Sequence, residues 1–482
     1  MGLAGCQLAP PPQVPTAPAV AGYTRTAMPA TLSPANGPAQ TLVVGREPSA
    51  RWWEAYGSAK LDRLVEQAVA ASPDLAAAEA ALRAARETAK AARGALLPTV
   101  DANYSLSRQQ VSKEISSPLA NNADLFTLHT LQVTVGYTPD VFGAQRYALA
   151  GAAAQAEGQR LQGEAAYLTL TSNVVAAVVQ RASLAAQVRE AEALVASCGR
   201  SLEGLRRQRS LGEAAGPDVL AQETVLAQAR QALPGLRRQL AAQDDLLAIL
   251  TGHTPSGSAV DAPDLEELVL PAELPVSLPS ELVHQRPDIR AAEANLNVAG
   301  AAVGAAIAAR LPSFPLSAAA GGQATDLSRL LSSGDAFWTL TGGATQPIFH
   351  GGQLKHKQRA AEAQLDQAKA QYRSAVMTAL QNVADTLEAL RQDADAVDAA
   401  AAVEGAAGRA QAAAERQLRA GEGSSLALLT AEQAQIQSRG AVVQARAQRL
   451  ADTAALFQAM GGGWRQRDDF PAAGPSKPQR PR

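Results

Sequence analysis

The sequence of 482 residues has few aromatic residues and two cysteines, and its charges nearly cancel. Phe, Trp and Tyr make up 4% of the residues, and the formal net charge is −2. No basic excess is present, which argues against nucleic-acid binding driven by charge. Two cysteines cannot build a disulfide framework, and we interpret Cys198 as a small buried residue. No run of about 18 apolar residues occurs, so no transmembrane helix is expected.

Proline is absent from two long stretches, 141–216 and 348–470. Proline breaks helix interiors, whereas alanine, the dominant apolar residue here, favours helix most strongly. We therefore predict single helices at 143–211 and 351–420, each of about 70 residues and roughly 100 Å long at 1.5 Å per residue. Helices of this length exclude an ordinary compact domain.

The chain contains an internal repeat. SPDLAAAEAAL at 72–82 and RPDIRAAEANL at 286–296 begin two aligned stretches of 27 residues, 13 of them identical, at an offset of 214. Both stretches end on Leu-Pro. We therefore divide the chain into two similar repeats, 51–260 and 261–464.

Each repeat also holds shorter helices that match its long helix in length. The repeated stretches predict helices at 74–96 and 288–310, and further helices are predicted at 217–251 and 424–460. Stacked end to end within its repeat, each pair of shorter helices is expected to match the long helix. Pro234 is expected to kink the helix at 217–251.

After each repeated helix the apolar period changes to two. Val100 and Tyr104, for example, alternate with Asp101 and Asn103. This alternation predicts four strands, at about 99–111, 127–141, 313–322 and 336–348. Two half-buried hairpins on a soluble core would give the same pattern, but the long helices favour strands of a membrane barrel. Four strands cannot close a barrel, and open edges do not occur in lipid. Three copies of the chain would supply twelve strands.

The termini carry separate signals. Leu3-Ala4-Gly5-Cys6 resembles the cleavage box of a bacterial lipoprotein, so 1–6 is interpreted as a truncated signal with Cys6 as the lipidated residue. Residues 7–50 are rich in Pro, Ala, Thr and Gly and are expected to form an extended tether. The polar tail 465–482 is expected to be disordered.

Four motifs resemble the TolC-like outer membrane factors, in the lipoprotein branch that serves RND-type tripartite efflux pumps. They are RWWEAYGSAKLDRLVEQAVAASPDL at 51–75, HQRPDIRAAEANL at 284–296, QPIFHGG at 346–352 and ALFQAMGGGW at 455–464. The resemblance covers nearly the whole chain. One departure is His350, where the family usually has Asp or Asn before a long helix; imidazole caps helices poorly, so that helix is expected to begin later.

The resemblance implies a mainly α fold with a β-barrel part: a homotrimeric duct with a twelve-stranded barrel in outer-membrane lipid and a long periplasmic α-helical barrel. It implies a passive exit duct for drugs or other small molecules. The partners would be a periplasmic adaptor and an inner-membrane RND transporter. Gln7 after Cys6 fits sorting to the outer membrane.

The turns that end the two long helices correspond at an offset of 209. Glycine after a helix is by itself the usual left-handed cap. The resemblance adds that these tips dock on the adaptor, and it assigns this role to Gly212, Glu213, Gly216, Gly421, Glu422, Gly423 and Ser424.

The resemblance also places the duct's gate at the second turn. The family has a leucine there, followed one and two turns later by Asp and Arg. The corresponding residues here are Leu426, Thr430 and Gln433. The leucine is kept, and a ring of three leucines can close a narrow pore by dewetting. The charged pair is replaced by neutral polar residues.

No catalytic constellation is present, so the chain is not expected to be an enzyme. The five histidines are scattered, and no metal, cofactor or nucleic-acid site is predicted. Two other functions stay open. One is a TolC-like duct of a type I protein secretion system, which gene neighbourhood would distinguish. The other is a structural coiled-coil scaffold, which would not require detergent for extraction.

Overall fold

The computed structural model describes residues 12–18, 20, 22–112, 114, 123–257, 260–332 and 334–466. They form two compact units. Unit 1 comprises residues 12–15, Ala81–Gln159 and Ala292–Tyr372; unit 2 comprises Thr16–Ala80, Arg160–Ala291 and residues 373–466. Neither unit coincides with one of the expected repeats. Each repeat contributes strands to unit 1 and helices to unit 2, so the units cut across the repeats.

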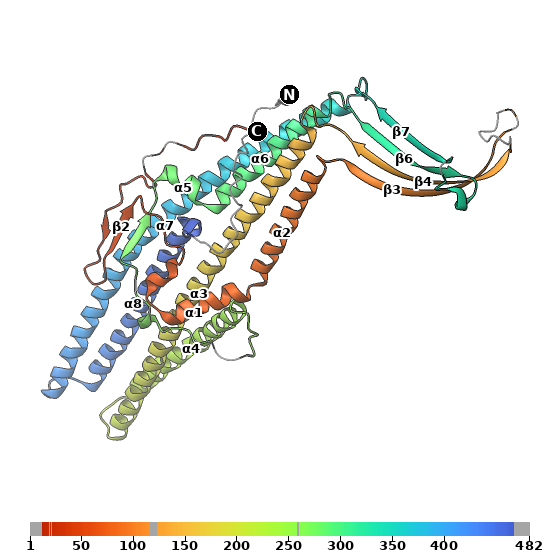
Figure 1. The fold of residues 1–482 in the computed structure, drawn as a ribbon. Helices are drawn as coiled ribbons and strands as arrows, with labels where there is room; N and C mark the ends of the chain where they lie inside the picture. The colour runs from red at the N-terminus through yellow and green to blue at the C-terminus, as the bar shows by residue number, and fades with distance from the viewer. Residues whose placement is uncertain are drawn as a thin grey trace. The chain divides into compact units, whose positions relative to one another are not determined.

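Unit 1 is built on a four-stranded antiparallel sheet. Its order is β3-β4-β6-β7, formed by β3 (Thr99–Gln110), β4 (Leu125–Tyr137), β6 (Leu316–Ala324) and β7 (Ala336–Gly342). The strands lie side by side as a curved ribbon in Figure 1. β3 and β7 each pair on one side only. The sheet of a single chain therefore has two open edges.

The second hairpin is shorter than the sequence predicted. The strand expected at about 313–322 is β6, which begins only at Leu316. The strand expected at about 336–348 is β7, which already ends at Gly342. Beyond them, a single bridge joins Ser313 to Thr345. Pro315 has no N–H group, so it cannot continue the ladder of hydrogen bonds.

Helices join the sheet at one end of unit 1. The end of α2 (Pro73–Gly94) leads into β3, and β4 leads into the start of α3 (Ala144–Ser210). In the same way, α6 (Pro287–Ala308) precedes β6, and α7 (Gln353–Arg419) follows β7. The β6–β7 connection and the paired strand ends Gln110 and Leu125 lie at the opposite end of the sheet (Figure 1).

One described helix, α6, is long and apolar enough, by length and composition alone, to cross a membrane. The expectation of no transmembrane helix did not foresee a helix that passes this test. That expectation counted unbroken apolar runs, which Glu293, Asn295 and Asn297 interrupt. The mean hydropathy of α6 is high because alanine and valine surround these polar residues. A third of its most apolar window is buried within the chain.

The start of α7 also differs from the expected residue 351. α7 begins at Gln353, whose N–H donates to the His350 carbonyl at 2.9 Å. Gly351 and Gly352 both have positive φ, so they lie outside the helix. The imidazole of His350 forms no described cap, which agrees with the later start expected there.

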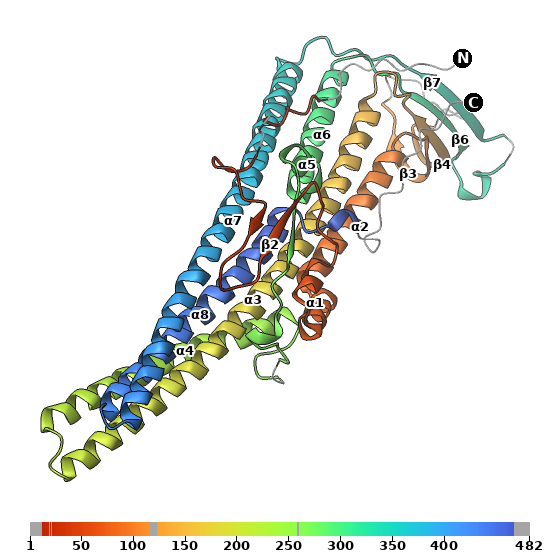
Figure 2. The same ribbon diagram turned by 90° about the vertical axis from the view of Figure 1, so that its left-hand side faces the viewer.

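Unit 2 holds most of the helical chain. It contains α1 (Ala59–Ala71), α4 (Gly216–Leu250), α5 (Pro279–Gln285) and α8 (Ser425–Ala459), together with the greater parts of α3 and α7. The helix α4 continues through Pro234. Figure 2 shows the α3–α4 and α7–α8 turns at the same end of this unit.

Part of the expected tether is a sheet. β1 (Thr31–Leu32) pairs antiparallel with β2 (Gln40–Val44), and β2 pairs parallel with β5 (Glu273–Val276). Sequence reasoning missed this sheet because its strands are short and more than 200 residues separate β2 from β5. The tail also begins later than expected, since Trp464–Gln466 forms a short helix and Arg465 pairs with Glu47 at 3.0 Å.

Three of the sequence motifs meet in the core of unit 2. The Trp52 ring stacks on Phe457, with ring centroids 5.2 Å apart. Tyr56 donates a hydrogen bond to the Leu450 carbonyl at 2.8 Å. Arg286 donates to the Ala459 carbonyl at 2.9 Å. The motifs at 51–75, 284–296 and 455–464 are thus one packed cluster.

The end of each shorter helix abuts the start of a repeated helix. A Cβ atom built on Gly252, just after α4, would lie 2.4 Å from the Cβ of Ala71, two residues before α2 begins. A Cβ atom on Gly461, after α8, would lie 2.9 Å from the Gln285 carbonyl oxygen, just before α6. These contacts agree with the expected end-to-end stacking, and only glycine fits such close approaches.

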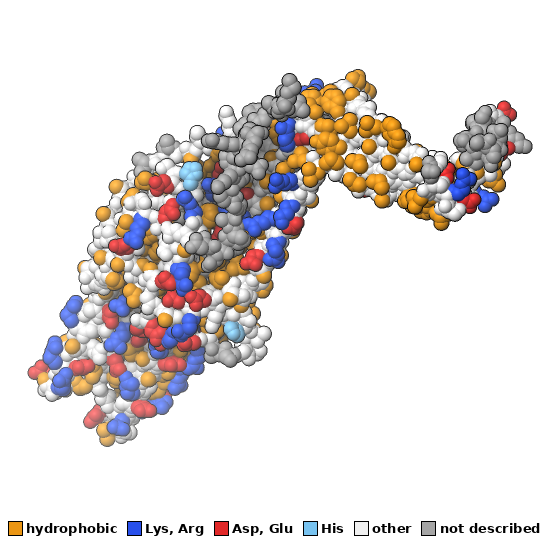
Figure 3. Space-filling model, in the orientation of Figure 1, with side chains coloured by type: hydrophobic (Ala, Val, Ile, Leu, Met, Phe, Trp, Pro, Cys, Tyr) orange, Lys and Arg blue, Asp and Glu red, His pale blue; other side chains and the backbone are white. Residues whose placement is uncertain are grey.

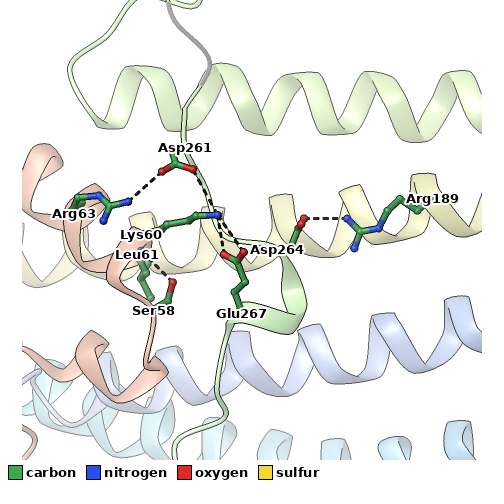
Figure 4. Close-up of polar contacts among 8 residues, drawn as sticks. All are labelled: Ser58, Lys60, Leu61, Arg63, Arg189, Asp261, Asp264 and Glu267. Carbon is green, nitrogen blue, oxygen red and sulfur yellow. Dashed lines mark hydrogen bonds and ion pairs between the residues drawn. The ribbon is translucent and has the colours of Figure 1, made fainter.

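Ion pairs attach the connection between the two repeats to α1 and α3 (Figure 4). Its acidic residues face basic residues of α1 and α3: Arg63–Asp261 (3.2 Å), Lys60–Glu267 (3.0 Å) and Arg189–Asp264 (3.0 Å). All six side chains are at least a third exposed. Exposed pairs of this kind contribute about 0–1 kcal/mol each, so they orient the connection more than they stabilise the fold.

Candidate functional site

The four-stranded sheet has two chemically different faces. Residues paired across an antiparallel sheet point to the same face. The pairing Ala102↔Val133↔Ala320↔Trp338 is therefore one row of a single face. Its neighbouring rows carry Val100, Tyr104, Leu106, Leu131, Val135, Tyr137, Leu316, Ala318 and Leu340. Figure 3 shows hydrophobic side chains over this face.

The opposite face is mostly small and polar over the middle of the strands. One of its rows is Asp101↔Thr134↔Ala319↔Thr339. The next row contains Asn103 and Gln132, and it ends at Phe337. The apolar face is exposed: Trp338 is 77% accessible and Val100 67%. An exposed apolar face of this extent is typical of a surface that meets lipid or protein.

The turn between α3 and α4 is closed by a Schellman motif. The Glu213 N–H donates to the Gln208 carbonyl (2.9 Å), and the Gly212 N–H donates to the Arg209 carbonyl (3.0 Å). Gly212 has φ +80°, which disfavours any residue with a side chain. Gly216 is the first residue of α4 rather than part of the turn.

The turn between α7 and α8 repeats this motif at the offset of 209. The Glu422 N–H donates to the Gln417 carbonyl (2.9 Å), and the Gly421 N–H donates to the Leu418 carbonyl (3.1 Å). Ser424 is the N-cap of α8, since its Oγ accepts from the Ala427 N–H at 3.1 Å. Both turns therefore expose the same backbone geometry.

The three residues expected at the gate lie along one side of α8, at spacings of four and three residues. Leu426 is 40% exposed. The Thr430 hydroxyl donates to the Leu426 carbonyl at 2.9 Å, within its own helix. The Gln433 amide donates to Ser201 of α3 at 3.5 Å. The two polar residues that replace the family's charged pair thus have partners inside the chain.

Polar side chains join α8 to α3 along unit 2. The Arg200 guanidinium and the Glu432 carboxylate are 2.5 Å apart. Gln208 donates to the Ser425 hydroxyl (3.3 Å), next to Leu426, and farther along the pair Gln444 donates to Gln187 (2.9 Å). Sequence reasoning gave no partner for Glu432. Its partner Arg200 lies 232 residues away and was missed.

The α3–α4 hairpin is held differently. Apolar residues of the two helices form a common core: Cys198, Leu202, Leu205, Val219, Leu226 and Ala229. The expected burial of Cys198 is confirmed. An apolar core is not readily opened, whereas a polar hydrogen bond contributes only about 0.5–1.5 kcal/mol net.

A charged cluster in unit 2 was not foreseen from the sequence. Arg449 of α8 is 2% exposed and donates to the Gln40 side chain at 2.9 Å. Asp393 of α7, 9% exposed, lies within hydrogen-bonding range of Asp452 on α8. Burial, together with the acidic Asp452, raises the pKa of Asp393 to about 7. Nothing in the sequence marks this aspartate as the buried one.

A match to one protein family decides which family this chain belongs to. The profile described as "Outer membrane efflux protein" matches residues 64–253 and 278–462. The chain belongs to the outer membrane efflux protein family. This confirms the sequence interpretation of an efflux channel of the outer membrane.

Individual relatives agree over nearly the whole length. The chain is 29% identical to the pyoverdine export outer membrane protein OpmQ of Pseudomonas putida, covering 96% of both chains. It is also 29% identical to the probable efflux pump outer membrane protein TtgC of the same species, over 96% of this chain and 93% of the relative. Among solved structures, the outer-membrane channel OprN superposes with a TM-score of 0.84 at 26% identity, over 95% of this chain and all of OprN. The expected mainly α fold of a TolC-like outer-membrane channel is thus confirmed.

Three sequence expectations cannot be located on the structure. Cys6 and Gln7 lie outside the described residues, as does most of the expected tail. Among the residues that are described, no group of three or more His, Cys, Asp or Glu side chains could hold a metal ion.

Proposed function

We propose that three copies of this chain form one exit duct, each copy adding its four strands to a twelve-stranded barrel in the outer membrane. The open edges of β3 and β7 carry this proposal, because unpaired backbone groups are not tolerated in lipid. The two repeats, 51–260 and 261–464, would supply two similar wall panels per copy. The apolar face then meets lipid, and the polar face lines the water-filled interior.

The duct would work with two partners. We assign the Schellman turns around Gly212–Glu213 and Gly421–Gly423 as the surface that docks on a periplasmic adaptor, which links the duct to an inner-membrane RND transporter. Support comes from their equivalent geometry: three copies would present six similar turns. Relatives named as efflux pump and export components favour small-molecule cargo over a type I protein secretion system.

We assign Leu426 as the narrowest ring of the resting duct. Because Thr430 and Gln433 carry no charge and each forms a hydrogen bond inside the chain, they supply no charged lock between copies. The Arg200–Glu432 and Gln208–Ser425 contacts would hold the turn closed in their place. Each such contact is weak, so docking at the turn could release α8 at a cost of a few kcal/mol.

Conductance in planar bilayers tests the channel and its gate together. Leu426→Ala removes much of the side chain that each copy contributes to the ring, and it is expected to raise single-channel conductance clearly. The double change Thr430→Ala with Gln433→Ala should raise it less, since neither residue carries charge. A conductance of Leu426→Ala equal to that of the parent would place the gate elsewhere. A protein that forms no channel at all would contradict the proposal of an exit duct.

Cys6 is proposed as a lipid anchor that supplements the barrel.

The substrate is set by the transporter, so complementation should be measured in an efflux assay. A host strain that lacks its own outer-membrane duct should regain resistance when the chain is expressed with a matching adaptor and transporter. Recovery only with an ATP-driven protein exporter would favour the type I system.

A further inference from the structure

The apolar face of the sheet carries one charged side chain among its described strand residues. Arg108 of β3 pairs with Thr127 of β4, so it points to the same face as Tyr104 and Leu106. No Asp, Glu, Lys or other Arg occupies this face of β3, β4, β6 or β7. Arg108 is exposed, and no carboxylate of its own face neutralises it.

The position of Arg108 along β3 is near the boundary of the apolar band. Eight residues of strand separate it from Val100, about 27 Å at 3.4 Å per residue. With strands tilted near 40°, this is about 20 Å of height, against about 25 Å for the apolar band of an outer-membrane barrel. Arg108 lies toward the connecting loops, on the side away from the helices. It therefore reaches the level of lipid headgroups in the outer leaflet.

Two neighbours complete a group of hydrogen-bond donors. His129 faces the same side and is diagonal to Arg108 across the β3–β4 pair. The Tyr104 hydroxyl lies 2.9 Å from His129 Nδ1. When the hydroxyl donates to Nδ1, the neutral imidazole carries its hydrogen on Nε2. A guanidinium and an imidazole N–H then lie at diagonal positions of the same face, which carries no carboxylate among its described strand residues.

We propose that Arg108 and His129 bind a phosphate group on a lipid of the outer leaflet, with Tyr104 positioning the imidazole. Guanidinium groups bind phosphate through paired, charge-assisted hydrogen bonds. Because the face carries no other charge, an anion there would find no competing carboxylate. The site would fix the height of the barrel in the membrane. It rests on the proposed function, in which this face meets lipid.

The test measures binding of lipid A to the purified trimer in detergent micelles, by native mass spectrometry. Arg108→Gln is expected to weaken binding by about tenfold or more, the loss typical of a charge-assisted hydrogen bond. His129→Leu should weaken it less. Arg329→Gln is the matched control, because Arg329 lies at the same end of the sheet but faces Asp335 at 3.7 Å. It should leave binding unchanged.

Other outcomes would overturn the proposal. Equal losses in Arg108→Gln and Arg329→Gln would indicate general charge attraction. Displacement of lipid A by millimolar inorganic phosphate would indicate a site for the free anion, and equal binding of dephosphorylated lipid A would exclude phosphate recognition. Single-channel conductance of the same preparations distinguishes a failure of this inference from a failure of the proposed function. If Arg108→Gln binds like the parent while both conduct, only this inference fails; if neither conducts, the proposed function fails.

Discussion

Replacing Asp393 with asparagine should stabilise the protein in a way that depends on pH. In the folded chain the Asp393 carboxyl is buried against Asp452, one of its oxygens accepts no hydrogen bond from the described residues, and its pKa is raised to about 7. Asparagine has nearly the same shape, carries no charge, and can donate its amide hydrogen to the Asp452 carboxylate. The substitution therefore removes a charge penalty while it keeps the packing.

The sign follows from proton binding. In the unfolded chain Asp393 loses its proton near pH 3.8, whereas in the folded chain it keeps the proton until about pH 7. Since the folded state binds more protons in this window, the free energy of unfolding falls as pH rises from about 4 to 7. At about 1.4 kcal/mol per pKa unit, the loss above pH 7 is at most about 4 kcal/mol. Water near the partly exposed Asp452 screens the pair, so we expect about 2 kcal/mol.

Thermal unfolding of the purified protein in detergent, at pH 5 and pH 8, measures this effect. The Tm advantage of Asp393→Asn over the parent should grow by about 1–2 °C between these two pH values. Asp398→Asn on the same helix is the matched control. The Ala35 and Asn36 N–H groups, each 2.8 Å away, lower the pKa of Asp398. Its contribution to stability is lost only as pH falls below about 4, so its effect should not change from pH 5 to 8. A constant advantage of Asp393→Asn over the same range would refute the reasoning.

Three further changes test other parts of the structure. Cysteine at Asn103 should react with a water-soluble thiol reagent in reconstituted membranes much faster than cysteine at Tyr104; equal labelling would argue for a soluble hairpin. Gly423→Ala should lower the Tm and impair efflux, because its Cβ would lie 2.9 Å from the Gln417 Cβ; an unchanged protein would show that the turn adjusts freely. Cys6→Ser, expressed behind a complete cleavable signal, should lose acyl labelling yet still trimerise, and retained labelling would exclude Cys6 as the anchor.

Local patterns were sufficient to predict the long helices, the four strands of unit 1 and the two equivalent turns. The alternation around Val100 and Tyr104 predicted strands, because a strand's side chains alternate between two faces. The absence of proline predicted the lengths of α3 and α7 to within two residues at each end. Glycines at the offset of 209 predicted equivalent turns, because a left-handed helix cap depends on one residue's backbone.

The amino-acid sequence by itself therefore determined the repeat, the long helices, the two-faced strands and the family. Only the tertiary structure decided which residues meet. In RQDADAVDAA, three aspartates look alike, yet only Asp393 is placed against Asp452, 59 positions away, because alanine-rich helices lack a strong apolar stripe to fix their buried face. The pairing of β2 with β5 and of Arg200 with Glu432 was equally invisible to local patterns. Burial and pairing depend on partners that are distant in sequence, and no period along one segment encodes them.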